Sequence, residues 1–301
     1  MRPPDAAEAE RLSAALSEYE DAHGVLPGIV AAENRTSFIE QVVESERRRR
    51  FVRQLATLDL SPLRADPTSV LFDPLKAAVI RQRMGQVDEA FWMVFLFVQF
   101  GRSRNGGWRY TRDVYGRLGS ALWDWRSVAA DPGGFATWLV ENASAIRANG
   151  QGGFGNHRKY ERLETTGEVV ESYVAWVGPE GSHAVRFAPD GAGGGDPRRA
   201  FAHLYASMAG ITRFGRTARF DYLTTVGRLG LAEIEPDRPY LGGATGPLKG
   251  ARLLFGSTAS PHELDGALQR LGQALDLAMD VVEDGVCNWQ KSPGQFRPFR
   301  G

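Results

Sequence analysis

The chain has few of the features that mark secreted, metal-binding or membrane proteins. Cys287 is the one cysteine among 301 residues, which excludes an internal disulfide framework and a cysteine-rich metal site. We therefore expect a cytoplasmic protein that uses no metal and no other cofactor. The most apolar run, residues 90–100, is about half as long as a bilayer-spanning helix. It predicts a buried helix and no membrane association.

The chain also has no excess of charge of either sign. Its 36 lysines and arginines balance 36 aspartates and glutamates. No global field therefore draws the protein toward nucleic acid, and a DNA-binding surface has to be local. Hydrophobic residues make up 43% of the sequence, enough for a substantial core.

Helix signals run along most of the sequence, so we expect a mostly α fold. Ser37 with Glu40 and Ser260 with Glu263 have the spacing of capping boxes, before helices predicted at 38–58 and 261–283. Asp73 followed by proline predicts a helix start, with an end at Gly85.

One part of the sequence allows two interpretations. Residues 169–177 and 183–187 are rich in β-branched and aromatic side chains and favour a short β-hairpin, while a helix over 167–176 competes with it. The glycine-rich residues 188–197 read as a linker. We expect an N-terminal helical region over 1–187 and a second module over 198–301, packed together as one unit.

Residues 208–231 predict two helices joined by a tight turn. Helices are expected over 200–209 and 217–229, and Gly210 and Gly215 bracket the turn between them. Thr212, Arg213 and Arg216 add polar and positive groups there. Such a hairpin can hold a DNA phosphate on its backbone amides. An ordinary corner of an all-α protein is the alternative.

Two other glycine-rich segments carry basic residues. Residues 101–110 combine glycines with side chains suited to phosphates and bases, namely Arg102, Arg104, Asn105 and Trp108. An irregular surface connection is the other interpretation of this segment. In residues 245–250, Gly246 and Lys249 could hold a phosphate at a helix start, although the spacing departs from a nucleotide-binding P-loop.

Three separated motifs resemble one known family. These are GGFGNHRKY at 152–160, FGRTARFDYL at 214–223 and PDRPYLGGATGPLKGARLLF at 236–255. Together they resemble the alpha-glutamyl/putrescinyl thymine pyrophosphorylase family, clade 3, over residues from about 97 to about 288. The resemblance implies a fold like that of helix-hairpin-helix DNA glycosylases and an enzyme that acts on a modified base in DNA.

The resemblance also suggests catalytic residues. Cleavage of a glycosidic bond develops positive charge on the sugar, which a nearby carboxylate stabilises. Glycosylases of this superfamily place an aspartate shortly after the second hairpin helix, which corresponds to Asp237. Asp221 lies within the family-like motif and is a nearly equal candidate. As structural alternatives, Asp221 could pair with an arginine and Asp237 could be a turn residue.

The motif at 152–160 supplies a proton donor and base-binding groups. His157 can donate a proton near neutral pH, and Asn156, Arg158, Lys159 and Tyr160 flank it. Bifunctional glycosylases carry a lysine at the start of the second hairpin helix, where this chain has Arg216. Arginine stays protonated, so no Schiff-base chemistry is expected at that position.

These interpretations favour a DNA glycosylase that excises a bulky hypermodified base, such as glucosylated hydroxymethylcytosine, from phage DNA and takes part in phage defence. Its expected partner is double-stranded DNA with modified bases, with no obligate protein partner. One alternative is a transferase that attaches an amino acid or a polyamine to pyrophosphorylated hydroxymethyluracil in DNA. A second alternative is a non-catalytic DNA-binding module.

Overall fold

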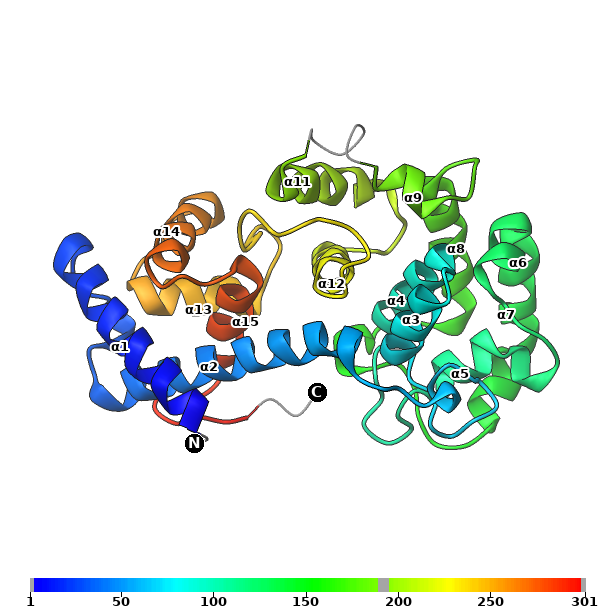
Figure 1. Cartoon of the computed structure of the whole chain (residues 1–301), viewed down its shortest axis with the longest axis horizontal. Helices are drawn as coiled ribbons and strands as arrows, with labels where there is room; N and C mark the ends of the chain where they lie inside the picture. The colour runs from blue at the N-terminus through cyan, green and yellow to red at the C-terminus, as the bar shows by residue number, and fades with distance from the viewer. Residues whose placement is uncertain (1–2, 189–194, 299–301) are drawn as a thin grey trace. The chain divides into compact units, whose positions relative to one another are not determined.

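The computed structural model describes residues 3–188 and 195–298. Helices make up most of this part of the chain, as predicted, and its β-type pairing is confined to an isolated bridge between Ser103 and Gly107 (Figure 1). None of its helices is long and apolar enough to cross a membrane. The chain forms two compact units. One combines the chain up to Val52 with the chain from Glu235 onward, and the other runs from Arg53 to Ile234.

The first unit is built from helices at both ends of the sequence. Its helices are α1 (Pro3–His23), α2 (Ala32–Gln54), α13 (Gly246–Phe255), α14 (Pro261–Ala274) and α15 (Met279–Trp289). Leu16, Phe38, Leu268 and Trp289 belong to its buried core. Helices α13 and α15 approach closely at Gly250. A Cβ atom there would lie 2.2 Å from the carbonyl oxygen of Val286, so only glycine fits.

The second unit surrounds one buried helix. Its helices are α3 (Pro74–Arg83), α4 (Val87–Phe100), α5 (Arg109–Tyr115), α6 (Trp125–Ala130), α7 (Pro132–Ala148), α8 (Leu163–Val177), α9 (His183–Arg186), α11 (Pro197–Ser207) and α12 (Arg216–Arg228). Helix α4 is buried along nearly its whole length and packs against α3 and α12. The predicted buried helix at 90–100 is therefore confirmed.

The predicted β-hairpin at 169–177 and 183–187 is wrong, and the competing helix is present. Both stretches are helical, in α8 and α9. Leu163, Val170, Tyr173 and Val177 are buried and recur at helical spacing along one face of α8. This periodicity outweighs the β-propensity of the individual residues.

The predicted helix ends had mixed outcomes. The capping box of Ser260 and Glu263 is confirmed, and Asp73 caps α3 as expected. Ser37 caps nothing, because α2 begins at Ala32 and the Ser37 hydroxyl, inside the helix, donates to main-chain oxygens. The helix that begins at Pro261 ends at Ala274, since the chain turns through Asp276 at a φ of 51°.

The two units differ from the division that composition suggests. Residues 189–194 of the expected linker lie outside the described residues. The segments on either side of it, α9 and α11, both belong to the second unit.

A buried chain of hydrogen bonds ties four helices of the second unit together. His183 is fully buried, with Nδ1 3.0 Å from Oδ1 of Asp88 and Nε2 2.7 Å from the Tyr173 hydroxyl. The Tyr173 hydroxyl is also 2.7 Å from that of Tyr222 on α12. Burial lowers the pKa of His183, so the ring is neutral at pH 7, donates to Asp88 and accepts from Tyr173. The series of hydrogen bonds thus runs from Asp88 on α4 through α9 and α8 to α12.

Replacing Tyr173 by phenylalanine tests this chain of hydrogen bonds. Its hydroxyl contacts both His183 and Tyr222, so Tyr173→Phe leaves two buried polar groups without it. We expect the free energy of unfolding to fall by about 1–3 kcal/mol, measured by urea denaturation. Tyr160→Phe is the matched control, because Tyr160 is 79% exposed. Equal stability of the two variants would contradict the role of Tyr173.

Candidate nucleic-acid interface

The turn between α11 and α12 lies at the surface of the second unit. Gly210, Thr212 and Arg213 are exposed, as is Gly215. Ile211 and Phe214 are 3% and 2% exposed, so apolar side chains fix the turn from below. The arrangement presents backbone and positive charge to solvent, as a phosphate-binding hairpin requires.

The left-handed backbone conformation in this turn belongs to Arg213, with a φ of 55°, and to neither glycine. Neither Gly210 nor Gly215 is therefore required by a left-handed backbone conformation. A Cβ atom on either glycine would meet nothing within 4 Å. The packing of the chain therefore does not require glycine at these positions. Their lack of side chains leaves room for an external group to approach the backbone. Gly215 also begins α12 without a side-chain cap, so the first amides of this helix face the turn.

Arg158 joins the motif at 152–160 to the hairpin turn. Its guanidinium donates to the main-chain oxygen of Gln99 at 3.2 Å and to the Gln99 side chain at 2.5 Å, and lies over the Phe214 ring at 5.6 Å. Glu161 is 3.7 Å from Arg158 and 3.4 Å from Arg213. Burial lowers the pKa of Arg158, and the charges of Glu161 and Asp221 oppose that shift. Asp221 therefore lies within electrostatic range of this cluster.

Two glycine loops pack backbone to backbone at the end of α4. The Gly155 amide donates to the Phe100 carbonyl at 2.7 Å, and a Cβ atom on Gly155 would lie 2.8 Å from the carbonyl carbon of Gly101. Further along, a Cβ atom on Gly106 would lie 2.4 Å from the oxygen of Gln151. The basic loop at 101–107 and the motif at 152–160 are thereby brought together with the hairpin turn.

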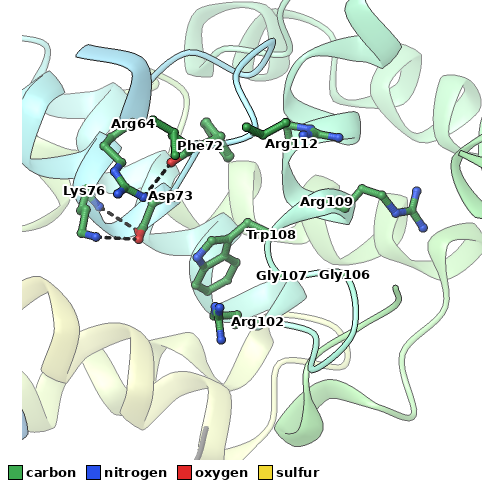
Figure 2. Close-up of a pocket in the computed structure, with 12 residues that line it drawn as sticks. Arg64, Phe72, Asp73, Lys76, Arg102, Gly106, Gly107, Trp108, Arg109 and Arg112 are labelled. Carbon is green, nitrogen blue, oxygen red and sulfur yellow. Dashed lines mark hydrogen bonds and ion pairs between the residues drawn. The ribbon is translucent and has the colours of Figure 1, made fainter. Parts of the chain in front are cut away.

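A pocket of about 540 Å³ opens on the basic loop. Figure 2 shows the Trp108 indole beside Arg102, with Asp73 and Lys76 on the opposite wall. The Trp108 ring is 5.2 Å from that of Phe97, so one side of it is supported by the core. Basic residues predominate in the lining, which includes Arg64, Lys76, Arg102, Arg109, Arg112 and one acidic residue, Asp73. Arg109 adds no free charge, because its guanidinium is paired with Asp113 and points away from Trp108 in Figure 2. Asp73 is already held at the N-terminus of α3 and lies 3.4 Å from Lys76.

Sequence reasoning found Arg102 and Trp108 but missed the other wall of this pocket. Arg64 and Lys76 come from a segment about thirty residues earlier that carries no motif, and the fold alone brings it to the loop. No signal in the sequence connects these positions.

The other predicted residues of the second unit divide into exposed and buried groups. Exposed side chains belong to Arg104, Asn105, His157, Lys159 and Tyr160. Asn156 is in a short 3-10 helix, Asn156–Arg158. Arg216 is 9% exposed and lies over the Phe220 ring at 4.6 Å, so its guanidinium packs within the unit.

Three predicted residues lie in the first unit. The Asp237 carboxylate accepts a 2.6 Å hydrogen bond from Tyr240 and is 3.9 Å from Arg238. A Cβ atom on Gly246 would lie 2.7 Å from the sulfur of Cys287, so helix packing already accounts for this glycine, and Lys249 is exposed. Of the two candidate aspartates, Asp221 shares a unit with the hairpin turn.

No group of three or more potential metal ligands occurs among residues 3–188 and 195–298. The described arrangement instead defines a helical protein with an exposed hairpin turn and a cationic pocket with an aromatic wall. The model of the family described as alpha-glutamyl/putrescinyl thymine pyrophosphorylase clade 3 matches residues 33–301, and the chain belongs to this family. The family name indicates an enzyme that acts on modified thymine in DNA. No curated protein and no solved structure matches the chain.

The contact between the two glycine loops gives a test of the interface. Gly155→Ala places a methyl group against the backbone of residues 101–102 and should separate the loops. We expect DNA affinity to fall about tenfold or more, measured by fluorescence anisotropy at fixed salt. Gly153→Ala is the matched control, since its Cβ atom would meet nothing within 4 Å. Equal binding by both variants would show that the loop contact does not shape the interface.

Proposed function

We propose that the protein is a DNA glycosylase that excises a bulky hypermodified base from phage DNA and leaves an abasic site. The main support is the exposed hairpin turn, with Arg213 and the N-terminus of α12, in the same unit as Asp221 and the motif at 152–160. A base such as glucosylated hydroxymethylcytosine is a suitable substrate class. Such an activity would serve phage defence.

The proposed mechanism begins with eversion of the modified nucleotide, because the glycosidic carbon is shielded inside the duplex. Arg213 and the N-terminus of α12 hold a backbone phosphate at the turn 210–215. The amides of Ile211, Thr212 and Phe214 are already used, because they donate to Met208 O, Ser172 Oγ and Ile211 O. Two aromatic side chains are available for stacking: Tyr160, which is 79% exposed, and Trp108 in the cationic pocket. Stacking on an aromatic ring tolerates different bases, so the modification itself has to be read elsewhere in the pocket.

Asp221 is the proposed catalytic carboxylate. An ionised carboxylate near the sugar stabilises the developing positive charge or activates a water molecule. The charge of Asp221 interacts favourably with that of Arg158, which favours the ionised carboxylate. His157, exposed in the same motif, is the proposed proton donor to the departing base. Asp237 remains the alternative carboxylate.

The family name favours a second candidate function, in which the enzyme is a transferase acting on activated thymine in DNA. A transferase attaches an amine to the base and leaves the glycosidic bond intact. Mass spectrometry of digested product DNA separates the two activities, since one releases a base and the other enlarges it.

Asp221→Asn tests the proposed chemistry. With DNA from a phage that carries glucosylated hydroxymethylcytosine, we expect the rate of base release to fall about 100-fold or more, because the amide carries no negative charge. DNA affinity should stay within about threefold, since the exchange is nearly isosteric. The measurement is the free base and the abasic sites, quantified by mass spectrometry.

Asp237→Asn is the matched comparison and should lower base release by less than about tenfold. The reverse ranking would move the catalytic role to Asp237. If the unaltered enzyme released no base from this DNA or from other hypermodified DNA, the glycosylase proposal would be wrong.

The absence of a lysine at the start of α12 predicts a monofunctional enzyme. Arg216 stays protonated and packs on Phe220, so it cannot form a Schiff base with the sugar. Borohydride added during the reaction should trap no covalent protein–DNA adduct. An adduct that disappears in Lys159→Arg or Lys249→Arg would identify another lysine as the nucleophile.

A further inference from the structure

The first unit contains a separate pocket of about 280 Å³. It lies between α2, the end of α15 and the segment that follows α15. Its lining residues are Ser37, Gln41, Asn288, Trp289, Lys291, Ser292, Gln295, Phe296, Arg297 and Pro298. None of them belongs to the proposed catalytic or DNA-binding groups.

Two buried donors in this lining have no hydrogen-bond partner among residues 3–188 and 195–298. Gln41 and Trp289 are each 2% exposed, and neither Nε2 of Gln41 nor Nε1 of Trp289 is paired within the described residues. A buried unpaired N–H group is costly and rare in folded proteins. Both residues line the same pocket, which points to a ligand with acceptor atoms for these two donors.

The charged residues of the lining indicate that the ligand carrying the acceptor atoms is negatively charged. Lys291 and Arg297 are exposed basic residues of the lining, and none of its ten residues is acidic. Trp289, Phe296 and Pro298 add apolar surface. A ligand that fits this pocket has oxygen acceptors, a negative charge and a small apolar body.

We propose that this pocket binds a small organic carboxylate, whose oxygens accept from Gln41 Nε2 and Trp289 Nε1. The basic residues Lys291 and Arg297 attract its charge. The ligand enters by displacement of residues 292–298, which form the outer wall. Residues 292–298 lie outside the helices and form short turns, and the Ser37 hydroxyl donates to the Pro293 oxygen.

The indole N–H of Trp289 provides a direct reading of occupancy. We would label the seven tryptophans of the full chain with ¹⁵N, assign Trp289 by comparison with Trp289→Phe, and titrate with sodium benzoate. The expected result is a saturable shift of the Trp289 resonance, which sodium chloride at the same ionic strength does not produce. Gln41→Met, which removes one donor at similar volume, should weaken benzoate binding about tenfold or more.

Two controls make the outcome decisive. Gln290→Met is the same exchange outside the pocket lining and should leave benzoate binding unchanged. Benzamide has the same ring and a carbonyl but no charge, and should bind at least about tenfold more weakly. Equal binding of benzamide would overturn the carboxylate assignment. Absence of a saturable Trp289 shift in the unaltered protein would overturn the site itself, whatever the stability of the variants.

Discussion

The candidate interface depends on how the C-terminal end of α4 satisfies its last carbonyl groups. A helix leaves its final carbonyls without partners, and a buried end needs donors from elsewhere. Here the Gly155 amide donates to Phe100, and Arg158 donates to Gln99. The positive charge of Arg158 also suits the negative end of the helix dipole. The family motif at 152–160 is thus fixed by the termination of a core helix, and the hairpin turn is fixed to that motif through Phe214 and Glu161.

The other end of α4 is held by different chemistry. Asp88 in its first turn accepts from both the main-chain amide and the ring of His183, and this lowers the pKa of Asp88. The bonds continue through Tyr173 to Tyr222 on α12. The hydroxyl of Tyr173 is hydrogen-bonded to both His183 and Tyr222. Small movements of α8 or α12 would therefore break this series of hydrogen bonds. The second hairpin helix is therefore fixed from inside the core, while its N-terminus stays open to solvent.

The sequence predicted the helical elements that carry strong local signals. Asp73 before Pro74, the capping box at Ser260 and the two hairpin helices were found because caps and apolar spacing are local properties. The pocket beside Trp108 was not, since Arg64 and Lys76 reach it only through tertiary packing. Glycine tolerates a left-handed conformation best, and two glycines bracket the turn, yet Arg213 is the residue that adopts it. Composition thus identifies a turn but does not place its strained residue.

A chain of zero net charge can still present a cationic surface if the fold engages its carboxylates selectively. In the pocket, Asp73 caps α3 and pairs with Lys76. Nearby, Asp113 accepts from Arg109 at 2.9 Å and from Asn149 at 3.1 Å, so it neutralises a buried arginine. Arg102 and Arg104, by contrast, are exposed on the loop between α4 and α5. Because Asp73 and Asp113 are engaged in a helix cap and a buried pair, the exposed charges of Arg102 and Arg104 stay available at a glycine loop, where a backbone can approach a phosphate closely.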